Sequence, residues 1–147
     1  MRVAQSKTKT IGEYEYIVTP LPSEESTEVL RRLSGVLGNG VAKLAGDSDG
    51  IAAIGGLFGS ITKEDKDYLL SVFVKQTWVK QGDRKLPLET CFNEHFRGSM
   101  DEQMQWVAFC MELNFRSFFS WAADKLKSSG VLKTQGLALN FQKASTP

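Results

Sequence analysis

The sequence has little of what metal binding and disulfide formation require. It contains one histidine, His95, and two cysteines, Cys91 and Cys110, which lie 19 positions apart with no CxxC motif. Zinc sites combine several Cys and His ligands at short spacings, and disulfide frameworks need a set of paired cysteines. We therefore expect no metal site and no disulfide, and two free thiols of the kind usual in cytosolic proteins.

An excess of charge and a long apolar run are also missing. Eighteen Lys and Arg residues balance seventeen Asp and Glu, for a net charge of +1. Nucleic-acid binding depends on clustered basic residues, and none are present. The longest apolar stretch, Trp106 to Met111, is far shorter than the roughly 20 residues of a membrane-spanning helix. The N-terminus also lacks the apolar segment of a signal peptide. We expect no nucleic-acid partner, no membrane and a cytoplasmic location.

Catalytic motifs are equally scarce, since neither GxSxG nor HExxH occurs. Glu94 and His95 could form a carboxylate–imidazole pair, but adjacent residues do not face each other on a helix. The simpler interpretation makes His95 a packed or hydrogen-bonded structural residue and both cysteines inert. Residues 50–56 are glycine-rich but lack the Lys-Ser/Thr pair of a phosphate-binding loop. The sequence thus predicts no enzyme and no cofactor.

Hydrophobic residues make up 41% of the chain, which is enough for a core. Alternation over residues 10–18 places Tyr14, Tyr16 and Val18 on one face and predicts an N-terminal strand. Two prolines end this strand, and an apolar pattern of helical period predicts a helix from about 24 to 37.

The middle of the chain gives weaker signals. Residues 38–60 are rich in glycine and are expected to be a mobile segment, with a short helix at 51–58. Thr62 is a good N-cap for a helix that extends to about Gln76. Residues 77–88 predict a β-hairpin around Gly82-Asp83, with the second strand at a sheet edge because of Pro87.

The clearest signal is a helix from Ser99 to about Lys127. Ser99 and Glu102 have the spacing of a capping box, in which each side chain accepts a hydrogen bond from the other residue's backbone. Apolar residues then form two stripes that cover most of the helix circumference. One small core needs only one stripe, so either the domain surrounds this helix or part of it binds a partner.

These elements predict a mostly α fold with a small β component: the N-terminal strand and the hairpin near 77–88. We expect a compact, single helical domain over residues 1–130 and an extended C-terminal tail over 131–147. The predicted core packs the last helix against two earlier helices, through Leu30, Leu33, Leu37, Leu69, Val72 and Phe73.

Three blocks of the sequence resemble the tail assembly chaperones of long-tailed, siphovirus-like bacteriophages. The blocks are a strand leading into a Leu-rich helix at 14–33, the CFNEHFRG run at 91–98, and the helix at 106–119. The last block ends in the pattern Glu-x-Asn-Phe followed by paired phenylalanines. The resemblance covers about two-thirds of the chain and leaves residues 1–9, the glycine-rich stretch and the tail unmatched.

The resemblance implies a non-enzymatic protein that binds the tape measure protein and keeps it soluble until tail tube protein assembles around it. Homo-oligomers and a cytoplasmic site of action in the bacterial host fit this role. A structural tail protein that stays in the virion, such as a completion or connector protein, remains an alternative. The expected partner-binding residues lie on the last helix: Met104, Trp106, Phe109, Leu113, Phe118 and Trp121.

Overall fold

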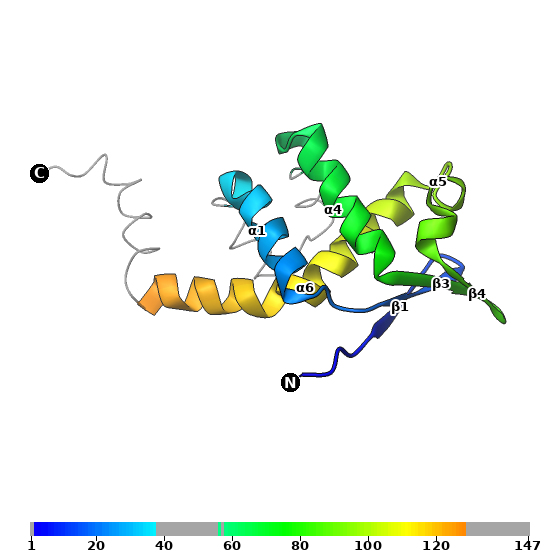
Figure 1. The fold of residues 1–147 in the computed structure, drawn as a ribbon, viewed down its shortest axis with the longest axis horizontal. Helices are drawn as coiled ribbons and strands as arrows, with labels where there is room; N and C mark the ends of the chain where they lie inside the picture. The colour runs from blue at the N-terminus through cyan, green and yellow to red at the C-terminus, as the bar shows by residue number, and fades with distance from the viewer. Residues whose placement is uncertain (1, 38–55, 57, 129–147) are drawn as a thin grey trace, which may run out of the picture.

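A computed structural model describes residues 2–37, 56 and 58–128 of the chain. Helices dominate this part, and a small antiparallel sheet lies at one end (Figure 1). The prediction of a mostly α fold with a small β component is confirmed. The elements with their bounds are β1 Lys7–Ile11, β2 Tyr14–Val18, α1 Ser23–Leu37, α4 Lys63–Lys75, β3 Thr77–Gln81, β4 Arg84–Pro87, the 3₁₀ turn η1 Leu88–Thr90, α5 Phe92–His95 and α6 Met100–Ser128.

The N-terminal part of the sheet is a hairpin, so the predicted strand is confirmed over Tyr14–Val18, whereas residues 10 and 11 belong to the preceding strand β1. β1 and β2 pair antiparallel, with Ile11 opposite Tyr14, and Gly12 and Glu13 form the turn between them. Gly12 has φ 62°, a left-handed conformation that glycine adopts readily. The alternation of polar and apolar residues is present in β2, but the chain reverses direction at Gly12, before that strand begins.

The second hairpin is confirmed at the predicted place. β3 and β4 pair antiparallel through a turn at Gly82, which has φ 61°. The strand order is β1-β2-β3-β4, so β4, which ends at Pro87, is an edge strand as predicted. β2 joins β3 across a long sequence separation, with Tyr16 opposite Val79.

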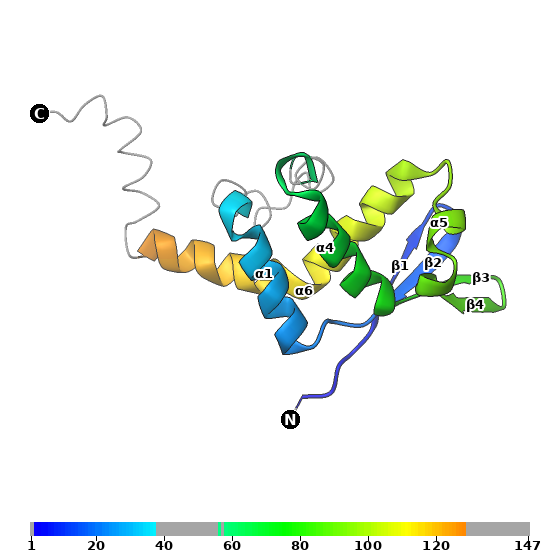
Figure 2. The same cartoon turned by 45° about the horizontal axis from the view of Figure 1, so that its top comes forward.

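The predicted helices at 24–37 and from Thr62 are confirmed, and Thr62 is the N-cap of α4. Its hydroxyl accepts a hydrogen bond from the Asp65 N–H at 3.1 Å. Figures 1 and 2 show α1 and α4 side by side and antiparallel, both crossing α6. The same views show α6 extending from α5, near the sheet, to the opposite end of the molecule.

The last helix is also confirmed, but its first turn differs from a capping box. The Ser99 N–H donates to the Phe96 carbonyl at 2.9 Å, so that donor is already used. The Glu102 carboxylate instead lies against the β1–β2 turn, and an ideal Cβ built on Gly12 would be 2.5 Å from Glu102 Oε2. Glu102 therefore connects α6 to the first hairpin rather than closing its own helix end.

One core joins the sheet to the three long helices. Of the predicted contributors from α1 and α4, Leu33, Leu69, Val72 and Phe73 are buried, and Leu30 is partly buried. The side chain of Leu37 lies outside the described residues, so this part of the prediction is untested. The largest fully buried side chains are Trp106, Tyr16, Phe73, Phe115 and Phe119.

Three predictions fall wholly or mostly outside the described residues. These are the mobile segment at 38–60, the short helix at 51–58 and the extended tail at 131–147. Within 38–60, residues 56 and 58–60 are described, and all four are helical.

Candidate functional site

The long helix α6 carries all six residues expected to bind a partner, and the structure divides them into three groups. One is fully buried, three are partly buried and two are exposed. The division follows position along the helix, because the sheet, α1 and α4 pack on its first part while its last turns extend past them (Figure 1).

Trp106 belongs to the core, so its assignment to a partner-binding surface is corrected. The side chain is 0% exposed, and the indole Nε1–H donates to the Thr77 hydroxyl oxygen at 3.1 Å. Thr77 in turn donates to the Phe73 carbonyl at 2.8 Å. A buried indole N–H needs an acceptor, and Thr77 at the start of β3 provides it.

Met104, Phe109 and Leu113 are partly buried and pack against the core. The Nζ of Lys9 on β1 lies 5.9 Å from the centroid of the Phe109 ring. Leu113 lines a groove that the N-terminal residues 2–5 and the β2–α1 connection form beside α6. Phe109 and Leu113 therefore lie beside the N-terminal hairpin and its flanking segments.

Phe118 and Trp121 are the exposed pair. Phe118 is 41% exposed and Trp121 is 56% exposed, and their ring centroids lie 6.0 Å apart. Phe118 also contacts the buried Phe119 edge-on, with 5.4 Å between centroids. The two rings form a continuous aromatic surface, which we call the aromatic end of α6.

The six residues therefore do not form one surface. Leu113 faces the N-terminal groove, whereas the aromatic end lies further along the helix. Helical spacing alone could not separate them, because Phe118 continues the stripe of Met111 and Phe115. Only the extent of the packing elements along α6 decides which members of a stripe are covered.

Sequence reasoning missed a second exposed tryptophan, besides Trp121. Trp78 on β3 is exposed on the open face of the sheet, beside Ile17 and Pro87 in the strand register. The Nζ of Lys85 lies 5.1 Å from the centroid of its ring. Alternation around the buried Thr77 and Val79 is the signal that could have placed Trp78 on the outer face.

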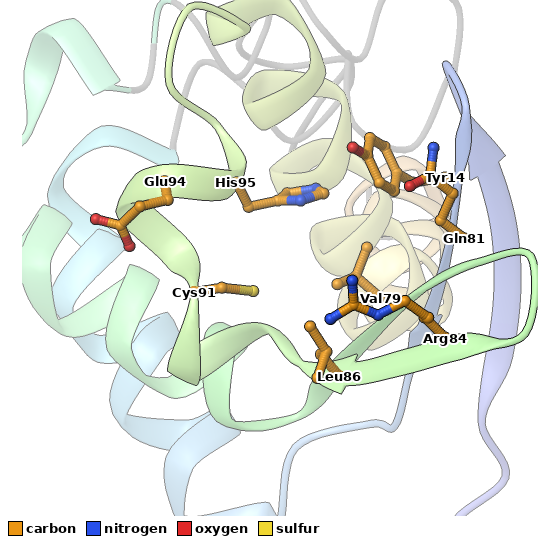
Figure 3. Close-up of a pocket in the computed structure, with 8 residues that line it drawn as sticks. All are labelled: Tyr14, Val79, Gln81, Arg84, Leu86, Cys91, Glu94 and His95. Atoms are coloured by element: carbon orange, nitrogen blue, oxygen red, sulfur yellow. The ribbon is translucent and has the colours of Figure 1, made fainter.

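His95 has the structural role that was favoured over a catalytic one. Its Nε2 is hydrogen bonded to the Tyr16 hydroxyl at 2.7 Å, and its ring meets Tyr14 edge-on at 4.5 Å between centroids. Burial lowers the pKa of His95, which favours the neutral imidazole. The Glu94 carboxylate points away from it (Figure 3), so the two residues form no acid–base pair.

Cys110 offers no reactive centre. Cys110 is fully buried in α6, and burial raises the pKa of its thiol, which keeps the sulfur protonated. Both thiols are free. Within the described ranges, no three His, Cys, Asp or Glu side chains group as a metal site would require, and no helix has the length and apolarity to cross a bilayer.

A family comparison decides among the possible roles. Residues 12–129 match the family model described as phage tail assembly chaperone protein, TAC. The chain belongs to this family of tail assembly chaperones. The match covers all three blocks on which the resemblance was based, so that identification is confirmed.

Family membership also settles the class of activity. Tail assembly chaperones are non-enzymatic, so the prediction that the chain is not an enzyme is confirmed. The family further implies partners among the phage tail proteins. No curated protein and no solved structure matches the chain.

Proposed function

We propose that this chaperone binds the tape measure protein in the bacterial host and keeps it soluble until tail tube protein assembles around it. The aromatic end of α6 is the proposed contact surface. The observation that carries the proposal is the pair Phe118 and Trp121, two neighbouring rings that are 41% and 56% exposed on the last turns of α6.

The chemistry of the aromatic end suits such a client. Exposed aromatic side chains supply large contact areas, and tryptophan is enriched among the residues that dominate binding energy. A long helical protein that aggregates presents apolar stripes along its helices, and these can pack beside an apolar helix face. The aromatic end would replace contacts that the tape measure protein otherwise makes with itself.

The position of the aromatic end on the helix supports the same role. Phe118 and Trp121 follow directly after Phe115, which is 1% exposed, so a client helix placed there would continue the packing of α6. Burial of apolar surface, rather than charge, would then drive binding, in keeping with a net charge of only +1.

Co-expression with the tape measure protein of the same phage tests the proposal. We expect soluble tape measure protein to co-purify with the native chain and to become insoluble with the double variant Phe118→Ala/Trp121→Ala. Lys125→Ala, on the exposed surface of the same helix segment, is the matched control and should behave like the native chain. Equal solubility with all three proteins would contradict the proposal.

Analysis of purified particles separates this role from the structural alternative. An assembly chaperone leaves before the virion is complete, so we expect the chain to be absent from purified phage. Its presence there in stoichiometric amounts would instead support a tail completion or connector protein.

A further inference from the structure

A second candidate site lies at the opposite end of the molecule from the aromatic end of α6. A cavity of about 250 Å³ opens between the sheet and α5 (Figure 3). The sheet contributes its inner face through β2, β3 and β4, and η1 and α5 cover one side. The lining residues are Tyr14, Val79, Gln81, Arg84, Leu86, Cys91, Glu94 and His95.

The wall combines apolar and polar side chains, and several of them are fixed by contacts of their own. His95 is fixed by its hydrogen bond to Tyr16 and by the edge-on contact with Tyr14. The Cys91 thiol lies 3.8 Å from the Pro87 carbonyl oxygen, and Val79 belongs to the buried core. A pocket whose walls are already held in place binds a ligand at a lower entropic cost.

Arg84 brings a positive charge to this wall. The strand register places it opposite Gln81 and two residues before Leu86, on the face of the sheet that also carries the buried Val79. Figure 3 shows its guanidinium reaching into the cavity, whereas the Glu94 carboxylate points out of it. Among the ion pairs and hydrogen bonds of the described part of the chain, none involves the Arg84 side chain.

We infer that this cavity binds a carboxylate carried on a short apolar group, with Arg84 as the residue that recognises the anion. The planar guanidinium presents paired N–H donors that match the two oxygens of a carboxylate. Val79, Leu86 and the Tyr14 ring provide the apolar surface for the rest of the ligand. The volume is below the range of about 300–1,000 Å³ usual for drug-sized ligands, so a group the size of one amino acid fits.

Two sources can supply this chemistry: a free aliphatic acid, or the C-terminal residue of a polypeptide. The inference does not depend on tape measure binding, because it concerns a surface formed by the sheet and α5. Arg84 could have a different role, because a charged residue that faces inward on an edge strand discourages strand pairing between molecules. The experiment is designed to separate ligand binding from that role.

The test is a chemical-shift titration of the isotope-labelled full-length chain with three probes. These are 4-methylpentanoate, N-acetyl-Gly-Leu with a free C-terminal carboxylate, and the same dipeptide as its amide. At about 20 mM probe, well above a Kd of about 1 mM, we expect saturable shifts at residues 81–95 with the carboxylates but not with the amide. Shifts with 4-methylpentanoate alone support the inference with a free acid as the ligand, and shifts with the peptide acid alone support it with a polypeptide C-terminus. Shifts with both carboxylates support a site that accepts either.

Variants give the second part of the test. Arg84→Gln should weaken binding at least about tenfold, as expected when a charge-assisted pair is lost. Lys85→Gln removes the same charge from the neighbouring residue on the outer face and should leave binding unchanged. If Arg84→Gln disturbs the spectrum as a whole, Arg84→Lys, which keeps the charge but not the paired donors, should still bind more weakly than the native chain.

Three results would overturn the inference. They are the absence of saturable shifts with either carboxylate, equal binding of the amide, and equal losses in Arg84→Gln and Lys85→Gln. Self-association of Arg84→Gln without any carboxylate binding by the native chain would leave edge protection as the role of Arg84.

Discussion

The two parts of α6 differ in what surrounds them, although their sequences are similarly apolar. The first part is held by the first hairpin through Glu102, by β3 through Trp106, and by α1 and α4 through the shared core. The last turns carry Phe118 and Trp121 with large exposed fractions. The same residue types therefore stabilise the fold in one part and remain available to a partner in the other.

Truncation of a phenylalanine in each part should give the largest contrast. Phe115→Ala should lower the free energy of unfolding by about 3–5 kcal/mol, because it leaves a cavity in the core. Phe118→Ala should cost much less, since a large fraction of its ring is already exposed. Thermal or urea unfolding of both variants measures this. An unchanged melting temperature for Phe115→Ala would contradict the comparison.

The second-largest loss of stability should come from disturbing the contact between the first hairpin and the first turn of α6. Gly12→Ala should cost about 1–3 kcal/mol for a left-handed alanine, plus the cost of displacing the Glu102 carboxylate. Gly82→Ala is the matched control, because Gly82 has nearly the same φ and open space around its Cβ position. Equal losses of stability in the two variants would show that the Glu102 contact contributes nothing.

The hydrogen bond of Trp106 should account for a smaller effect. Thr77→Val keeps the shape of the side chain but removes the acceptor, so the buried indole N–H loses its partner at about 1–2 kcal/mol. Thr77→Ser retains the hydroxyl and should recover most of this. Chemical denaturation measures both variants. If Thr77→Val were as stable as the native chain, the first part of α6 would not be fixed in this way.

The smallest effect concerns His95, directly before α6. Burial lowers the pKa of His95 below its usual 6.5, so the unfolded chain binds more protons just below that pH. The contribution of His95 to stability is therefore complete above pH 6.5 and declines as the pH falls toward the folded-state pKa. His95→Gln should remove this dependence between pH 7 and 5.5. Unfolding curves of both proteins with the same pH dependence there would argue against it.

The sequence predicted the helices and the second hairpin because their signals are local. Thr62 is a cap residue at the start of an apolar pattern, and Gly82-Asp83 is a turn between two short strands. The first hairpin was missed for the opposite reason. The turn at Gly12 leaves the alternation of polar and apolar residues intact, so the pattern does not reveal the chain reversal. The pairing of β2 with the distant β3 depends on tertiary contacts.

The sequence could predict the helix that carries the candidate site, but not which of its residues are exposed. Periodicity identified α6 and its two apolar stripes, but it could not tell that Trp106 is buried and Trp121 exposed. That difference arises from elements distant in sequence, such as Thr77 on β3, that cover one part of the helix. The position of Arg84 in the cavity could not be predicted either, because it depends on the strand register, which places Arg84 on the inner face of the sheet.

A binding titration at two salt concentrations tests the central claim, that the aromatic end of α6 binds the tape measure protein, most directly. The native chain, Trp121→Ala and Lys125→Ala are each titrated into a co-purifying fragment of that protein at low salt and at about 0.5 M salt, where the Debye length is only a few ångströms. The account predicts that native binding persists at high salt, that Trp121→Ala weakens it at least about tenfold, and that Lys125→Ala does not. Release of the fragment by salt, together with unchanged binding by a folded Trp121→Ala variant, would contradict it.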